Sequence, residues 1–363
     1  MISYYTGISF ITVLSMVVMI VVVRTNFLIN QKVRNGFTNV AILIMLVAVF
    51  EWVGYTFTVP GRFCKVIKLT VKCLEFSLAP YIPIACSNTV SGEAISMREI
   101  ILLVIHFILE TMSAFIGFIY YVDENNIYYH GRLYIIYIMA YILGALFLFC
   151  KSIQLKKKYQ GNNSGLILVI LVFLFLGIPL QMIYEHIRVD WLVVAIALYM
   201  YYTFYNQLVL QIDPVTMLLN RTCYDKYIRN IKSDAVVTVF DINNFKGIND
   251  NYGHQYGDEI LGIVGTAIKE TYGKYGLGFR IGGDEFCAVI MKGYDRIDNI
   301  TYAFEDYMNE RRKADERVPK VAIGYSLYKH DKNLIDDTIK AADDMMYMNK
   351  KAGINRYNVR IFM

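Results

Sequence analysis

Charged residues are scarce in this sequence. Only 18% of its 363 residues are Asp, Glu, Lys or Arg, whereas 56% are hydrophobic. The mean hydropathy of +0.39 is too high for a wholly soluble protein and points to membrane spans. The scarcity is uneven, because charge is sparse before Tyr205 and dense after it. We therefore expect a membrane-embedded half followed by a soluble half.

Other absences narrow the class of protein. The six cysteines show neither a CxxC pair nor Cys/His spacing, so metal-ligand and disulfide frameworks are weakly supported. The first apolar stretch lacks a basic start and a clear cleavage site, which argues against a signal peptide. The net charge of +5 is attributed to basic loops beside the membrane, so no nucleic-acid partner is expected.

Seven apolar stretches precede the soluble half, most close to the ~20 residues that span hydrocarbon. They are Ile8–Val23, Val40–Val59, Val66–Ala85, Ile100–Val122, Leu133–Phe149, Leu166–Met182 and Trp191–Leu208. Pro80 and Pro83 interrupt the third stretch. We interpret residues 1–205 as a multi-span, signal-sensing domain in the cell membrane. Lys and Arg gather mainly in the odd-numbered loops, which predicts an outside amino terminus and a cytoplasmic carboxyl-terminal half.

No Gly/Ser-rich linker follows the last span. Residues 206–212 are therefore expected to continue its helix as a short, stiff connector, with a plain spacer as the alternative. The tyrosines between Tyr199 and Tyr205 are interpreted as an interfacial belt. Five ionisable residues lie in or near the spans: Glu51, Glu75, His106, Glu110 and Glu185. They indicate either a signal-binding cavity or, as we favour, interhelical hydrogen bonding.

The soluble half contains a hairpin pattern. Two short apolar runs, Leu277–Ile281 and Cys287–Ile290, flank the sequence Gly282-Gly283-Asp284-Glu285. This pattern predicts a β-hairpin whose glycines take the positive φ of a tight turn. Bare backbone beside paired carboxylates suggests a nucleotide held through a metal ion. A solvated turn with no ligand is the alternative.

A buried strand is predicted upstream of the hairpin. The β-branched run Val236–Phe240 ends at Asp241, and open α/β sheets bind ligands where a central strand ends. Later elements complete a mixed α/β order, in which helices pack on a central sheet. They are a helix over about Asp298–Lys313, a strand over Val321–Leu327, a helix over Leu334–Lys350 and a strand over Tyr357–Ile361.

Four blocks of the soluble half resemble, in order, the GGDEF family of diguanylate cyclases. They are Asp213–Arg221, Asp241–Asp258, Gly282–Phe286 and Ala342–Lys350. For residues 213–363 the resemblance implies a cyclase-like, ferredoxin-related sheet with flanking helices. It also implies a membrane-bound diguanylate cyclase that condenses two GTP into cyclic di-GMP and two pyrophosphates. A non-catalytic GTP-binding signalling protein is the alternative, and a receptor or transporter with a regulatory soluble domain is a third hypothesis.

Metal-assisted phosphoryl transfer needs carboxylates that hold Mg²⁺ or Mn²⁺. We expect Asp241 and Asp284 to supply them, and the resemblance adds the backbone carbonyl of Ile242. The resemblance also implies that Asp284 accepts the proton of the attacking 3′-hydroxyl, with Glu285 as a supporting acid. Arg280 is expected to stabilise the transferring phosphoryl group.

Guanine recognition needs acceptors for N1–H and the N2 amino group and a donor for O6. Asn249 and Asp258 provide these groups, and the family uses its equivalents in this way. Four more residues fall at substrate-contacting family positions: Phe245, Lys246, His254 and Lys350. Ordinary core, solvated or helix-capping roles remain alternatives for those four. One site holds one GTP, so we also expect a homodimer, controlled by an unknown signal ligand or partner.

The sequence departs from the family pattern in several places. Met217 replaces a glycine, and Asn243 replaces an acid. In the closing block Gly353–Arg356, Ile354 stands where a phosphate-contacting arginine is usual. The product-binding R-x-x-D motif upstream of the hairpin is absent, so feedback inhibition through that motif is not expected.

Overall fold

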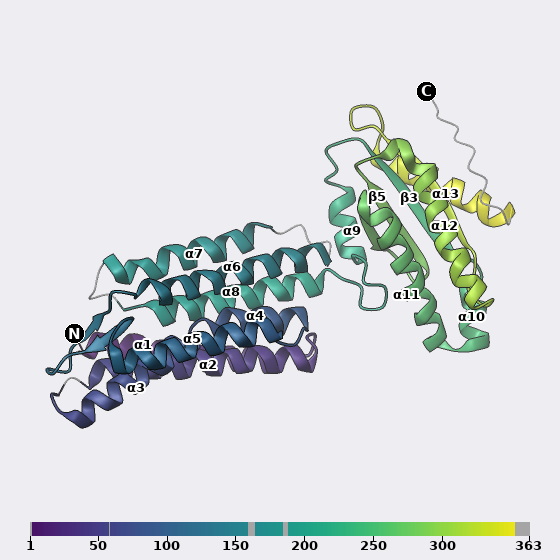
Figure 1. The fold of residues 1–363 in the computed structure, drawn as a ribbon. Helices are drawn as coiled ribbons and strands as arrows, with labels where there is room; N and C mark the ends of the chain where they lie inside the picture. Colours follow the sequence, from purple (N-terminus) through teal and green to yellow (C-terminus); the bar gives the residue numbers. More distant parts are fainter. Residues whose placement is uncertain (1, 58, 159–163, 184–187, 353–363) are drawn as a thin grey trace. The chain divides into compact units, whose positions relative to one another are not determined.

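The computed structural model describes residues 2–57, 59–158, 164–183 and 188–352. The chain forms two compact units, Met1–Val209 and Leu210–Met363, which are coloured purple to teal and green to yellow in Figure 1. Each unit has its own buried apolar core. The predicted strand Tyr357–Ile361 and the closing residues Gly353–Arg356 lie outside the described residues.

The first unit is a bundle of helices. Its described elements are α1 (Ile2–Thr25), α2 (Gln31–Thr56), α3 (Arg62–Leu78), α4 (Tyr81–Ser91), α5 (Met97–Ile116), β1 (Tyr120–Val122), β2 (Tyr128–His130), α6 (Ile135–Lys158), α7 (Ser164–Ile183) and α8 (Asp190–Leu210). Six described segments are long and apolar enough to cross a membrane: Tyr4–Thr25, Gln31–Thr56, Arg62–Ser91, Met97–Ile116, Ile135–Leu155 and Asp190–Leu210. The seventh predicted span corresponds to α7, whose stretch Gly165–Leu174 is a shorter apolar helix.

Two predicted spans differ in detail from the structure. The third is divided into α3 and α4 around Ala79 and Pro80, as expected from a residue that lacks an amide hydrogen. The fourth prediction extended too far, because α5 ends at Ile116. Gly117, with φ of +84°, caps that helix, and β1 then pairs with β2 in a short hairpin.

Three of the four tyrosines near the end of α8 are buried, so for these three the interpretation as an interfacial belt was wrong, whereas Tyr199 is half-buried. Tyr201, Tyr202 and Tyr205 are each at most 5% exposed. Their rings lie 5.3–6.3 Å from the ring of Phe37 on α2. This half of α8 is therefore held inside the bundle by aromatic packing.

The ionisable residues of the helical unit pair with one another. The contacts include Lys72–Glu75 at 2.7 Å, His106–Glu110 at 3.5 Å and Arg188–Glu51 at 3.7 Å. His106 also places Nε2 3.0 Å from the carbonyl of Phe76, which joins α5 to α3. The His106–Phe76 bond supports interhelical hydrogen bonding, whereas the Lys72–Glu75 and His106–Glu110 contacts each lie within one helix. Glu185 lies outside the described residues.

The second unit is a four-stranded antiparallel sheet between helices. Its main elements are α9 (Arg221–Ile228), β3 (Ala235–Ile242), α10 (Phe245–Tyr252), α11 (His254–Thr271), β4 (Gly276–Arg280), β5 (Glu285–Ile290), α12 (Ile297–Ala314), β6 (Val321–Tyr328) and α13 (Ile335–Ala352). The strands lie in the order β4-β5-β3-β6. The predicted strands, hairpin and later helices within the described residues are confirmed to within a few residues.

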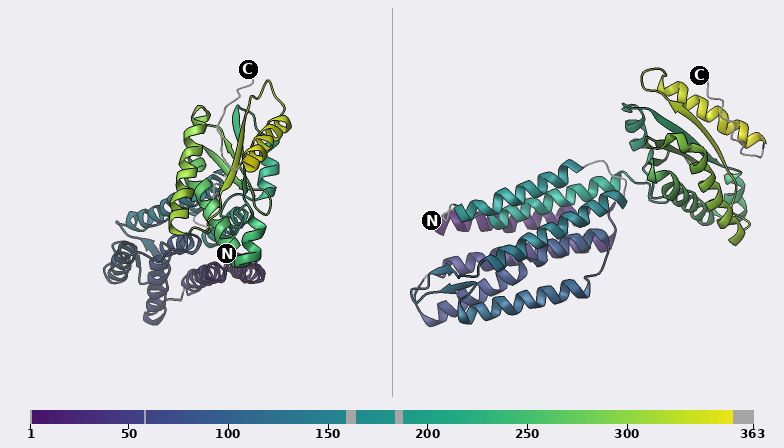
Figure 2. Two further views of the ribbon diagram at one scale, coloured as in Figure 1. Left: turned by 90° about the vertical axis from the view of Figure 1, so that its right-hand side faces the viewer. Right: turned by 45° about the horizontal axis from the view of Figure 1, so that its top comes forward.

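Alternating residues of β3 determine which helices cover each face of the sheet. Phe240 belongs to a buried cluster with residues of α11 and α12, such as Val264 and Phe304. Val239 faces the other way and packs with Ala342 of α13. The left view of Figure 2 accordingly shows α12 (green) and α13 (yellow) on opposite sides of the sheet. This buried scaffold fixes the ends of the strands, where the site residues lie.

Candidate active site

The hairpin presents the two glycines and two acids in the connection between β4 and β5. Arg280 is the last residue of β4, and Glu285 is the first of β5. Neither Gly282 nor Gly283 has a positive φ, so the reason given for these glycines was wrong. A Cβ added at Gly282 would lie 2.7 Å from Glu285 Oε2, the end of an exposed side chain that can move away, so space alone does not require this glycine. At Gly283 no atom lies within 4 Å of such a Cβ, which leaves open backbone there.

The end of β3 lies beside the hairpin. Asp241 is paired in register with Glu285. One residue further on, the amide of Ile242 donates to the carbonyl of Asp284 with an N–O distance of 3.3 Å. The strand that ends after Asp241 and the strand that follows Asp284 are thus direct neighbours, which allows the two acids to act together.

Asp241 has a cationic partner from the carboxyl-terminal helix. Lys350, in the last turn of α13, places Nζ 2.5 Å from Asp241 Oδ1. The Asp241 side chain is only 14% exposed. A lysine expected near phosphates therefore lies directly beside the carboxylate expected to hold a cation.

The helix pair α10–α11 brings the predicted guanine-binding residues to one place. Gly253, with φ of +84°, joins the two helices, a conformation that favours glycine. The side chain of Asn249 lies against Gly257, where an added Cβ would be 2.0 Å from Asn249 Oδ1 and 3.4 Å from Phe245 Cζ. Asp258 follows Gly257 directly and is exposed. Asn249 therefore reaches the first turn of α11, beside the residue that precedes Asp258.

The other predicted substrate residues lie at exposed helix starts. Lys246 occupies the first turn of α10, and His254 is the first residue of α11; both are exposed. Neither side chain forms a hydrogen bond with another residue of the described ranges. Asn243, which replaces a family acid, has a buried Oδ1 without a hydrogen-bond partner among the described residues.

Arg280 is held by the protein itself. Its guanidinium donates to both carboxylate oxygens of Asp213 at 3.1 Å. It also donates to the carbonyl of Gly282 at 3.2 Å and to that of Gly283 at 2.8 Å. These bonds tie the opening block of the unit to the hairpin turn. Arg280 was expected at the phosphoryl group, and its clamp on Asp213 was not predicted. The only sequence signal for the clamp was that Asp213 begins the first block of the family pattern.

The clamp also sets the ionisation of Asp213. Burial acts to raise the pKa of this carboxyl, but hydrogen bonds from Thr216 and the Arg280 guanidinium outweigh it. The pKa of Asp213 is therefore lowered from its ordinary value. At neutral pH this carboxylate is ionised and serves as a fixed anchor for the hairpin.

Met217, at the glycine position of the opening block, has φ of +58°. This left-handed conformation is costly for a residue that carries a Cβ. The backbone therefore keeps the conformation that the glycine would favour, although the glycine is absent.

Residues 210–356 match the family model described as diguanylate cyclase, GGDEF domain. The chain is 32% identical over 153 residues to YtrP, an uncharacterised protein of Bacillus subtilis, covering 40% of this chain and 25% of YtrP. It is 30% identical over 158 residues to the probable diguanylate cyclase DgcC of Escherichia coli, covering 40% of this chain and 42% of DgcC. The matches thus span less than half of either relative.

Among solved structures, the GGDEF domain of DgcB from Caulobacter crescentus, crystallised with c-di-GMP, is similar. It is 24% identical in sequence, with a TM-score of 0.36, covering 40% of this chain and 90% of that one. The family match spans all four sequence blocks, including Asp241 at the end of β3 and the intact hairpin motif. Residues 210–356 of this chain are therefore a GGDEF domain with a probable diguanylate cyclase among its homologues.

Proposed function

We propose that the chain is a membrane-bound diguanylate cyclase that condenses two GTP into cyclic di-GMP and two pyrophosphates. The observation that carries this proposal is the pairing of β3 with β5. It sets Asp241 opposite Glu285 and beside Asp284, although the two strands are distant in sequence. A domain that only bound GTP would have no need to retain these acids.

A divalent cation fits the donor set at this edge. Mg²⁺ commonly binds through one or two carboxylates together with substrate phosphates and water. Asp241, Asp284 and the carbonyl of Ile242 would hold Mg²⁺ or Mn²⁺. No group of three or more His, Cys, Asp or Glu in the described part of the chain could hold a metal alone. When bound, the cation would neutralise charge on the phosphoryl oxygens and lower the pKa of the attacking hydroxyl.

The protein residues take separate roles in this proposal. Asp284 accepts the proton of the 3′-hydroxyl, with Glu285 beside it as a supporting acid. Asn249 and Asp258 bind the guanine edge, and we assign Arg280 to holding the hairpin turn through Asp213. The open backbone at Gly283 gives the triphosphate room to approach. Four more residues complete the proposed GTP site: Phe245, Lys246, His254 and Lys350.

The reaction needs two subunits. Each 3′-hydroxyl attacks the α-phosphate held by the other site, so two copies must face each other as a homodimer. The apolar helices would anchor the protein in the cell membrane, with the cyclase unit in the cytoplasm, where GTP is available. A signal acting on the helical unit would shift the balance between dimers whose two cyclase sites face each other productively and dimers whose sites do not. The order of strands and helices in the second unit supports a ferredoxin-related cyclase fold.

The direct test is GTP turnover by the full-length protein in detergent or lipid nanodiscs with Mg²⁺. Chromatography should detect cyclic di-GMP from the parent and from Asp295→Asn, which alters an exposed acid outside the site. Asp284→Asn, which keeps the side-chain shape, should make no detectable product. Folded parent protein that binds GTP yet forms no product, even when dimerised by an added coiled coil, would favour the non-catalytic alternative.

A further inference from the structure

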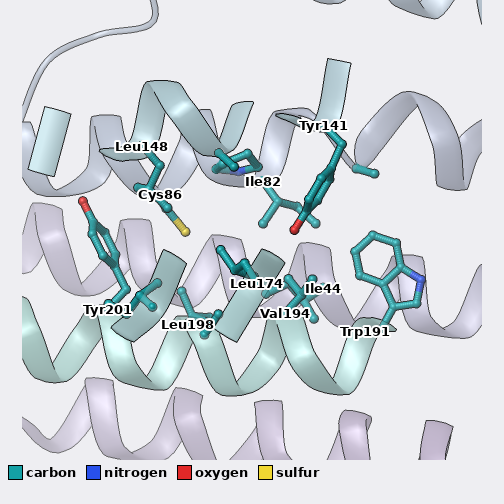
Figure 3. A pocket seen from close by; sticks show the side chains of 15 residues that line it. Ile44, Ile82, Cys86, Tyr141, Leu148, Leu174, Trp191, Val194, Leu198 and Tyr201 are labelled. Atoms are coloured by element: carbon teal, nitrogen blue, oxygen red, sulfur yellow. The ribbon is translucent and has the colours of Figure 1, made fainter. Parts of the chain in front are cut away.

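A narrow pocket lies inside the helical unit. Fifteen described residues from α2, α4, α6, α7, α8 and the break before α4 line this pocket, and the space of about 510 Å³ between their atoms includes open solvent, so the enclosed part is much smaller. Trp191 and Tyr201 of α8 lie toward opposite ends in Figure 3. These residues are ten positions apart, which corresponds to about 15 Å along a helix. The pocket is therefore long in one direction and follows α8.

The lining is apolar and uncharged. No Asp, Glu, Lys, Arg or His is among the fifteen described lining residues. An ion or charged metabolite would lose its hydration there without gaining a partner. The hydroxyl of Tyr141 points into the pocket in Figure 3. Since it forms no hydrogen bond with any residue in the described ranges, one polar atom of a ligand would find a partner there.

The break between α3 and α4 helps to form this space. α6 approaches α4 closely there, because a Cβ added at Gly144 would lie 2.7 Å from Pro83 Cγ. Small side chains, Ala79 and Ala145, line the pocket beside this close contact. The backbones are thus packed tightly while the adjacent side chains leave a gap. The pocket therefore results from small side chains that lie beside a tight contact between α4 and α6.

We propose that this pocket binds an uncharged molecule from the bilayer, one with a narrow apolar chain and a single hydroxyl or carbonyl group. α8 forms its longest wall and runs on to Leu210, where the GGDEF unit begins. Occupancy therefore acts on the helix that leads into the cyclase, which makes this ligand an input signal. That regulatory step rests on the proposed cyclase activity, whereas binding itself does not.

Tryptophan fluorescence tests the binding step directly. The chain has two tryptophans, and Trp52 donates to Thr6 rather than lining the pocket. In full-length Trp52→Phe protein reconstituted in lipid vesicles, Trp191 is the only tryptophan and therefore the only reporter. 10-Bromo-1-decanol, whose bromine quenches on contact, should quench it saturably. The charged 10-bromodecanoate should bind at least ten-fold more weakly.

Matched variants in the Trp52→Phe background locate the bound probe. Ala197→Phe fills the pocket and should abolish saturable quenching. Ile196→Phe alters the neighbouring residue, which is 40% exposed and outside the lining, and should not. Ala145→Leu on α6 gives the same test if Ala197→Phe does not fold. Tyr141→Phe should weaken bromodecanol binding by about 2- to 10-fold, the usual effect of one hydrogen bond.

Three binding results would overturn the site. They are non-saturable quenching that is equal in all variants, equal binding of the charged probe, and a co-purified charged lipid that the alcohol does not displace. GTP turnover in the same samples tests the regulatory step. Saturable binding without any change in turnover would remove the signalling role but leave the site. Absence of turnover in all samples would count against the proposed function alone.

Discussion

Lys350 Nζ lies 2.5 Å from Asp241 Oδ1, so the carboxylate proposed to hold a divalent cation is already paired with a cation of the protein. The Lys350 side chain is 37% exposed, and solvent therefore screens the pair from one side. A metal ion that binds Asp241 must compete with this ammonium group, and Lys350 then becomes available to the phosphates of GTP.

Lys350→Met should strengthen metal binding in the absence of nucleotide. A partly exposed ion pair contributes about 0.5–1 kcal/mol, so Mn²⁺ affinity should rise about two- to five-fold. Electron paramagnetic resonance titration of free Mn²⁺ measures this change. Lys351→Met is the matched control, since Lys351 lies over the ring of Tyr347 in the same helix. Equal affinity in the parent and both variants would show that Lys350 does not compete with the metal.

Met217→Gly should stabilise the second unit. Removing the Cβ relieves about 1–2 kcal/mol of left-handed strain, of which about 0.4–1 kcal/mol is offset by the greater freedom of the unfolded chain. For a unit of this size the melting temperature should rise by about 1–4 °C. Met217→Ala keeps the Cβ and should give no such gain. A loss of stability in the glycine variant would mean that the packing of the Met217 side chain outweighs the strain.

Asp213→Asn should loosen the hairpin in a pH-dependent way. The folded pKa of Asp213 is lowered, so its stabilising effect is complete above the unfolded value of about 4 and fades as the pH falls toward the folded pKa. At pH 7 the variant should lose about 1.5–3 kcal/mol, the usual range for hydrogen bonds to charged groups. Below about pH 4 the melting temperatures of variant and parent should converge. Asp225→Asn, on the exposed side of α9, should match the parent throughout.

Gly257→Ala should weaken GTP binding without affecting the hairpin. The added Cβ would lie 2.0 Å from Asn249 Oδ1, so the Asn249 side chain must move away from the first turn of α11. Loss of its hydrogen bonds to guanine should raise the dissociation constant for a non-hydrolysable GTP analogue about ten-fold. Gly262→Ala in the same helix meets nothing closer than 3.6 Å and should leave binding unchanged. Unaltered affinity in Gly257→Ala would argue against Asn249 as a guanine ligand.

The elements of the second unit could be predicted because their signals are local. Val236–Phe240 is a continuous β-branched run, and the helices that follow have clear apolar faces. The positions of the acids at strand ends followed from the same patterns. What brings Asp241 beside the hairpin is the order of the strands in the sheet, which these local patterns do not specify.

Contacts between distant residues could not be predicted in this way. Lys350 and Asp241 are 109 positions apart, and Arg280 and Asp213 are 67 apart. The local sequence around Arg280 or Lys350 does not identify the acidic residue with which each side chain pairs. The roles of the hairpin glycines could not be predicted either. Their presence indicated a turn, but it did not reveal whether backbone conformation or space required each glycine. The same holds for the tyrosines of α8, whose burial depends on Phe37 of another helix.

Because Asp241 pairs with Glu285, the site forms only when β3 and β5 are in the correct register. Successive residues of a strand point to opposite faces, so a slip of one position between β3 and β5 would turn one of these acids to the other side of the sheet. A misaligned sheet would still be compact and rich in secondary structure, yet it would lack the site. Catalytic output can therefore separate correctly aligned molecules from misaligned ones that spectroscopy of secondary structure would count as folded.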